Sequence, residues 1–189
     1  MDIRGFAAGL AEQIEGAHPS GRLLNEGAFE RQHIIVPAWE LSRLHPEIRV
    51  FSHPGNRRAR CTPTCDTGAS KFTHRVEGCP RCWARSKARC VADVFGTRNN
   101  FDLVAVDRSD GSLAVEVKWL SLSDTKGPNA EFQRFVGQCA LAATANDIVI
   151  GVCGLRGRRK RQLDAHEGEL KAKLDKIGVR LIVLRADAG

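Results

Sequence analysis

The sequence predicts an α/β fold in which helices cover both faces of a mixed sheet. Apolar residues recur at helical spacing in residues 2–16 and 131–145, and two short apolar runs meet at an Asp-Gly turn within residues 101–119. Runs rich in Ile and Val at 147–153 and 179–184 are typical of buried strands, with a polar helix between them. This alternation predicts one α/β sandwich, and a length of 189 residues fits one domain with a small insertion.

The N-terminal quarter of the chain predicts two helices and a strand. Residues 2–16 carry apolar side chains on one helical face. Asn25 is expected to cap a second helix that begins near Glu26, and Pro37 is expected to kink or divide it. Residues 48–53 predict a short strand that Pro54 and Gly55 stop. The predicted order of core elements is helix, strand, strand, strand, helix, strand, helix, strand.

Three charged residues stand in the two hairpin strands, where an ordinary buried strand would not place them. They are Asp102, Glu116 and Lys118. Side chains alternate along a strand, so Glu116 and Lys118 point the same way, and a loop of roughly four residues places Asp102 opposite Glu116 or Val117. Two carboxylates and an ammonium then converge, which is how proteins hold a divalent metal beside a water. A solvated edge or a structural ion pair are the alternatives.

Both faces of this hairpin are otherwise apolar. The face with the charges also carries Val104, Val106 and Ala114, and the opposite face carries Leu103, Ala105, Leu113, Val115, Val117 and Trp119. Strands that are apolar on both faces are usually central and covered on both sides. Charges in such a place need partners or a chemical role.

Residues 56–95 differ in composition from the rest of the chain and predict an inserted module. Cys61 and Cys65 form one close pair, Cys79 and Cys82 another, and thirteen residues separate the pairs. Two such knuckles suit a tetrahedral structural Zn²⁺ site, whereas disulfides are rare in reducing compartments. His53, His74 and Cys90 are spare donors that could replace one of the four. Residues 81–95 are expected to close the module as a helix.

The charge of the chain suits a polyanionic partner. The formal net charge is +7 and the sequence pI is about 9.3. Basic residues gather in two clusters that are candidates for phosphate contacts: Arg57, Arg58, Arg60, Arg81, Arg85, Lys87 and Arg89, and then Arg156, Arg158, Arg159, Lys160 and Arg161. Solvated surface faces are the plain alternative for such runs.

The hairpin residues resemble the motif of the PD-(D/E)xK nuclease superfamily. The matching positions are Asp102 and then Glu116-Val117-Lys118, although Phe101 stands where the motif is named for Pro. The segment 134–138 also looks like the helix that follows the ExK strand in many members, where a Gln faces the site. The resemblance covers residues 20–153 as a pattern of elements, and its specific part is limited to 101–138.

The resemblance implies a restriction-endonuclease-like core that cleaves phosphodiester bonds, with DNA favoured over RNA. Asp102, Glu116 and the Val117 carbonyl would bind Mg²⁺ or Mn²⁺, and Lys118 would hold or help deprotonate the attacking water. Many members add a helix Glu, for which Glu26 is favoured over Glu30, and Gln138 would orient Lys118 or a water. A homodimer is compatible with the resemblance, but no residue pattern selects it.

The expected organisation is residues 1–55 with the first helices and strand, 56–95 as the zinc-binding insertion, and 96–189 as the nuclease core with the hairpin. The rival functions are a catalytically inactive nuclease-like protein that only binds nucleic acid, and an adaptor that meets an acidic partner. No apolar run can span a bilayer, and the N-terminus lacks a signal-peptide layout, so a cytoplasmic location is the default expectation. No Gly-x-Ser-x-Gly elbow occurs, which disfavours a serine hydrolase.

Overall fold

A five-stranded mixed sheet forms the centre of the computed structural model, which describes residues 1–19, 25–52, 89–94, 97–121, 129–156 and 161–186. The strand order is β1-β4-β5-β6-β7. The strands are β1 (Arg49–Ser52), β4 (Leu103–Val106), β5 (Ser112–Ser121), β6 (Ile148–Arg156) and β7 (Val179–Arg185). β1, β4 and β5 pair antiparallel, while β5, β6 and β7 pair parallel, so the predicted mixed sheet is confirmed.

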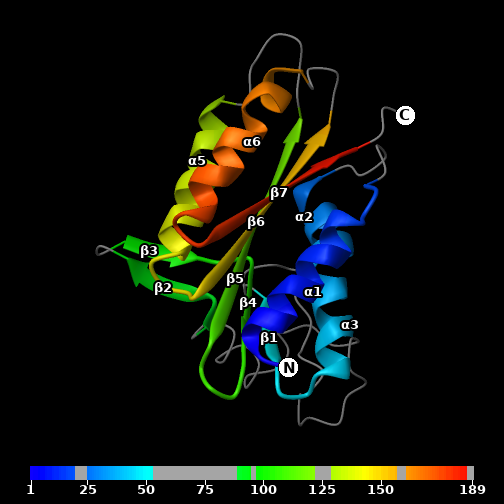
Figure 1. The fold of residues 1–189 in the computed structure, drawn as a ribbon, viewed down its shortest axis with the longest axis vertical. Helices are drawn as coiled ribbons and strands as arrows, with labels where there is room; N and C mark the ends of the chain where they lie inside the picture. Colours follow the sequence, from blue (N-terminus) through cyan, green and yellow to red (C-terminus); the bar gives the residue numbers. More distant parts are fainter. Residues whose placement is uncertain (20–24, 53–88, 95–96, 122–128, 157–160, 187–189) are drawn as a thin grey trace.

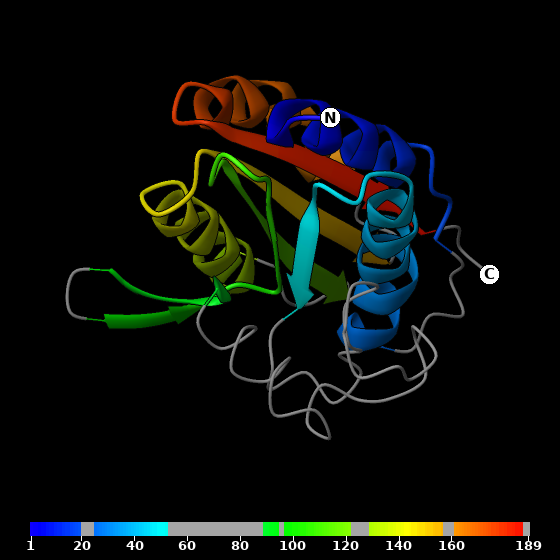
Figure 2. The same ribbon diagram turned by 90° about the horizontal axis from the view of Figure 1, so that it is seen from below.

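Helices cover both faces of the sheet (Figures 1 and 2). One face carries α1 (Ile3–Glu15) and the run of α2 (Glu26–Glu30), η1 (Arg31–Ile35) and α3 (Val36–Leu44). The other face carries α5 (Asn129–Ala142) and α6 (Arg161–Asp175). The two parallel crossovers, β5-α5-β6 and β6-α6-β7, place their helices on the same face.

Each face of the sheet has its own apolar core. The first core holds the inward side of α1 together with Leu103, Val115, Val117 and Trp119. The second holds Val104, Val106 and Ala114 beneath residues of α5 and α6. The two faces therefore divide as the alternation in the sequence predicts, and β4 and β5 are covered on both sides.

The β4–β5 hairpin closes through residues 107–111, one residue more than expected. Its register pairs Leu103 with Val115 and Val106 with Ser112. Asp107 organises the turn, because its Oδ1 accepts hydrogen bonds from the Ser109 and Gly111 amides and its Oδ2 accepts one from the Ile3 amide. One buried carboxylate thus ties the hairpin to the start of α1.

The second predicted helix is divided into three parts. Asn25 caps α2, since its Oδ1 accepts a hydrogen bond of 2.9 Å from the Ala28 amide, as expected. A π-helical turn then leads into α3, whose first turn contains Pro37. Because proline lacks an amide donor, it is tolerated in a first turn, and the π-turn absorbs the change of register just before it.

The predicted helix at 81–95 is wrong for its last residues. Residues 91–94 form β2 (Val91–Val94), which pairs antiparallel with β3 (Thr97–Asn100) in a separate two-stranded ribbon. β-branched Val at both ends of β2 favours an extended chain, and the pairing partner is a wholly polar strand with no apolar alternation to signal it. The ribbon lies across the expected boundary between residues 95 and 96.

Candidate active site at the free edge of β5

The candidate site forms where β5 extends beyond its neighbour β4. The pairing of these strands ends at Leu103 with Val115, whereas β5 continues to Ser121. Alternate amides of a strand point to the same edge, so Val117 and Trp119 present their N–H groups where no β4 residue pairs. Asp102 Oδ2 accepts the Val117 amide at 2.8 Å, and Glu26 Oε2 accepts the Trp119 amide at 3.0 Å. Two carboxylates from distant parts of the chain therefore replace the missing strand.

A polar cleft of about 250 Å³ opens at this edge. Its lining comes from α2, the end of β3, β5 and α5, and consists of Glu26, Asn100, Asp102, Glu116, Val117, Lys118, Glu131, Arg134 and Gln138. The cleft is concave and unusually rich in ionisable groups, which is typical of sites that do chemistry.

Glu116 is the most unusual residue of the cleft. The residue is 3 % exposed, its side chain lines the cleft, and among the described residues it has no hydrogen bond or ion pair. Burial raises its pKa well above the usual range for a glutamate, and the nearby charges of Asp102 and Glu30 raise it further. A buried carboxyl group without a partner is costly in its ionised form, so this position favours either a proton or a bound cation.

Asp102 stands next to Glu116, and its pKa is also raised, although less than that of Glu116. The register of β4 and β5, extended by one residue, places Asp102 opposite Glu116, as the hairpin spacing predicts. Burial raises the pKa of Asp102, and Glu26 adds to the rise, whereas the Val117 hydrogen bond and Lys118 oppose it. A positive charge between Asp102 and Glu116 would lower the pKa of both groups.

Lys118 is held at the cleft by Glu26. Its Nζ lies 3.0 Å from Glu26 Oε2, the same oxygen that accepts the Trp119 amide. Beneath them the Trp119 ring packs on Phe29 of α2 with ring centroids 4.9 Å apart. Gly154 of β6 makes this packing possible, because a Cβ there would lie 2.7 Å from Trp119 Cζ3 and 2.9 Å from Phe29 Cζ.

Polar side chains of helix α5 form one wall of the cleft. Glu131, Arg134 and Gln138 recur at spacings of three and four residues, so they share one helical face. The opposite face of α5 packs Phe135 and Cys139 into the second core. Arg134 is exposed and forms no ion pair or hydrogen bond in the described parts of the chain. A guanidinium left unpaired beside so many carboxylates is available to a phosphate group.

The donor set fits a hard divalent cation that keeps part of its water shell. Asp102 and Glu116 supply carboxylate oxygens, and the Val117 carbonyl shares the free edge with the Val117 amide. No group of three or more His, Cys, Asp or Glu residues stands in ligand geometry within the described residues. Mg²⁺ is commonly bound through one or two carboxylates with several waters, so two carboxylates and a carbonyl suffice.

The structure brings six of the predicted site residues to one cleft. They are Asp102, Glu116, Val117, Lys118, Glu26 and Gln138. Glu30 lies one turn beyond Glu26, is buried, and does not line the cleft, although its charge contributes to the raised pKa of Glu116. The chemical roles of these residues stay predictions.

The predicted zinc module and most residues of the two predicted basic clusters lie outside the described part of the chain. This applies to Cys61, Cys65, Cys79, Cys82, His53, His74, Arg57, Arg58, Arg60, Arg81, Arg85, Lys87, Arg158, Arg159 and Lys160, and to the side chain of Arg161. Of the rest, Arg156 is exposed at the end of β6, and Arg89 lies 3.8 Å from Asp110. Cys90 is fully buried in the second core, where burial raises the pKa of its thiol, and its role as a spare zinc ligand stays a prediction.

Sequence reasoning missed three residues of the cleft: Asn100, Glu131 and Arg134. Glu131 and Arg134 share the helical face of Gln138, so their spacing could have revealed them. Asn100 could not be found in this way, because its position depends on the β2–β3 ribbon.

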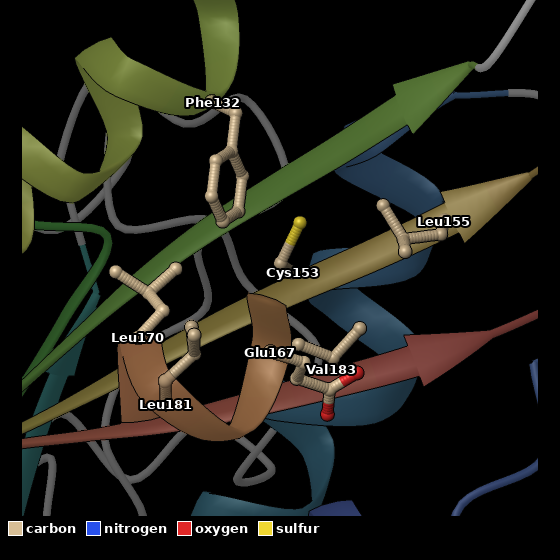
Figure 3. A pocket seen from close by; sticks show the side chains of 7 residues that line it. All are labelled: Phe132, Cys153, Leu155, Glu167, Leu170, Leu181 and Val183. Atoms are coloured by element: carbon tan, nitrogen blue, oxygen red, sulfur yellow. The ribbon is translucent and has the colours of Figure 1, made fainter. Parts of the chain in front are cut away.

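A second, apolar pocket of about 50 Å³ lies between α5, α6 and the sheet (Figure 3). Phe132, Cys153 and Leu170 line it, and Glu167 at its wall is paired with Lys171 at 2.7 Å and with Arg185 at 2.5 Å. Burial raises the pKa of the Cys153 thiol to about 12, so it is no nucleophile at neutral pH. Cys153 and Cys139 are packing residues of the second core.

Comparison with known proteins identifies no family. No family model matches the chain, and no curated protein matches it. One solved structure, described as Pyrococcus furiosus SfsA in complex with Ca²⁺, aligns with a TM-score of 0.30 and 17% sequence identity, covering 46% of this chain. This chain spans 42% of the length of that one. None of the described helices is both long enough and apolar enough to cross a membrane.

Proposed function

We propose that this protein is a metal-dependent nuclease that hydrolyses phosphodiester bonds in DNA. One observation carries the proposal: Glu116 is a buried, unpartnered carboxyl group directly beside a second carboxyl group, in a cleft that also holds a lysine. Such a pair is costly alone and well suited to a divalent cation. The spacing Asp102, then Glu116-Val117-Lys118, resembles the PD-(D/E)xK motif and supports the same reading.

Each residue has a stated role in this proposal. Asp102, Glu116 and the Val117 carbonyl hold Mg²⁺ or Mn²⁺, and the cation supplies positive charge to the phosphate and acidifies the attacking water. Lys118 orients that water and stabilises negative charge as the phosphate becomes pentavalent. Glu26 keeps Lys118 in place through the 3.0 Å ion pair. Arg134 binds a phosphate group along the strand, and Gln138 orients Lys118 or a water.

The test is cleavage of supercoiled plasmid, linear duplex and single-stranded DNA, and of RNA, in Mg²⁺ or Mn²⁺. Lys118→Ala should lower the cleavage rate by about 10²–10³-fold or more, since it removes a donor to the developing charge. Asp102→Asn should do the same while it keeps an oxygen for the Val117 amide. Unchanged thermal melting would show that both variants remain folded.

Glu12→Gln is the matched control, because Glu12 is exposed on α1, across the sheet from α5. This variant should cleave at the wild-type rate. A folded wild-type protein that cuts none of these substrates would contradict the proposed activity. DNA binding without any response to Mg²⁺ would instead favour the rival of an inactive binding protein.

A further inference from the structure

The β2–β3 ribbon projects from the sandwich beside the cleft. It is a separate antiparallel pair outside the five-stranded sheet, and it extends away from α5 in Figure 2. Its base is anchored where the Phe101 amide donates to the Cys90 carbonyl at 2.8 Å, next to Asp102. Asn100, the last residue of β3, lines the cleft itself. The ribbon is therefore continuous with the candidate active site.

The two faces of the ribbon differ. Ala92 packs against the second core, so the face with Ala92 turns inward at the base. Asp93 lies opposite Arg98 and Val91 lies opposite Asn100, which places these four on the other face. Asp93, Arg98 and Asn100 are all exposed. The ribbon is therefore supported by the core on its Ala92 face and leaves a polar face open to a partner.

The dimensions and chemistry of this face fit the major groove of double-stranded DNA. The four residues of β3, from Thr97 to Asn100, span roughly 10 Å between the first and the last Cα. The major groove of B-DNA is about 8.5 Å deep and about 12 Å wide, and it admits a two-stranded ribbon. The sequence of β3 is Thr-Arg-Asn-Asn, and Arg and Asn are the side chains that bind guanine and adenine edges there. The major groove of double-stranded RNA is too narrow for side chains to read.

We propose that the β2–β3 ribbon enters the major groove of double-stranded DNA beside the cleavage site, with Arg98 as its principal contact. The cleavage site in this inference rests on the proposed nuclease function. The inference adds the substrate class, which is a DNA duplex rather than a single strand or an RNA duplex. Arg134 and Lys118 meet the phosphate backbone in the cleft, and the ribbon reads the adjacent groove.

The test measures binding without cleavage. Fluorescence anisotropy in EDTA compares the full-length protein on a 24-base-pair DNA duplex, one strand of it, and an RNA duplex of the same sequence. The wild type should prefer the DNA duplex. Arg98→Ala should weaken duplex binding at least about fivefold, the loss expected for one good contact to a base edge, and so lower the ratio of duplex to single-strand affinity.

Arg4→Ala is the matched control, because it removes an exposed arginine from α1 on the other face of the sheet. This variant should bind duplex DNA like the wild type. Methylation of guanine N7, which blocks the major groove, should also interfere with binding, whereas a minor-groove ligand should not compete. Equal duplex affinity of Arg98→Ala and wild type, or competition by the minor-groove ligand alone, would overturn the inference.

The outcomes also separate this inference from the proposed activity. Ribbon-dependent duplex binding without cleavage in Mg²⁺ or Mn²⁺ would leave the inference standing and remove the nuclease. Cleavage that Arg98→Ala does not affect, with equal binding, would remove the ribbon and leave the nuclease. A wild type that binds no DNA would overturn the ribbon inference.

Discussion

Glu116 is a buried carboxyl group whose ionised form is destabilised by its surroundings. It is buried on the α5 side of β5, and the charges of Asp102 and Glu30, which are of the same sign, add to the effect of burial on its pKa. Its folded-state pKa is therefore raised above the unfolded value. Such a group binds more protons in the folded state than in the unfolded state at intermediate pH, so the stability of the metal-free protein falls as the pH rises from the unfolded pKa through the folded pKa.

Glu116→Gln should remove this penalty. We expect the metal-free variant to be more stable than wild type at pH 8 by on the order of 1–3 kcal/mol, and to show a flatter dependence of stability on pH. Urea unfolding between pH 5 and pH 8 in EDTA measures the difference.

A metal titration completes this prediction. Added Mg²⁺ or Mn²⁺ should stabilise the wild type and leave the variant nearly unchanged, because binding to the folded state alone raises stability. A variant that is less stable than wild type at pH 8 in EDTA would contradict the assignment of Glu116 as an unpartnered carboxyl group.

The elements around the site depend on close packing between α2, β5 and β6. Gly154 leaves room for Trp119 and Phe29, and these rings position the neighbouring Glu26 and Lys118. Gly154→Ala should lower stability by about 1–3 kcal/mol through overpacking and should reduce cleavage as Trp119 moves.

Gly168→Ala on α6 is the control, since a Cβ there meets nothing within 4 Å. It should stabilise the helix by roughly 0.5–1 kcal/mol. Chemical unfolding and cleavage rates of both variants provide the measurement, and equal effects would contradict the packing argument.

The sequence predicted the elements correctly wherever its apolar pattern was compatible with only one kind of secondary structure. Alternation assigned both faces of β4 and β5 correctly, and the hairpin spacing placed Asp102 opposite Glu116. The pattern could not reveal β2 and β3, because a polar strand carries no alternation and its identity comes from its partner. Arg134 was overlooked although its spacing of four residues from Gln138 places it on the same helical face, which the fold turns toward the cleft.

We expect the elements of the molecule to differ in the free energy of local unfolding. β6 pairs with β5 and β7 along most of its length, whereas β5 pairs with β4 only over residues 112–115. Both strands are covered on both faces, and the ribbon stands outside the sheet. Amide hydrogen exchange should therefore be slowest in β6 and in the doubly paired first part of β5, and fast in β2 and β3. Addition of duplex DNA should slow exchange in the ribbon selectively. A ribbon that exchanges as slowly as β6 in the free protein would contradict this order.

The extension of β5 beyond β4 has a consequence for the behaviour of the protein in concentrated solution. An unpaired strand edge is a template on which further chains can assemble. Here the carboxylates of Asp102 and Glu26 occupy the Val117 and Trp119 amides at that edge. Loss of either carboxylate would therefore leave an unpaired amide at this edge, where a strand of another molecule could pair.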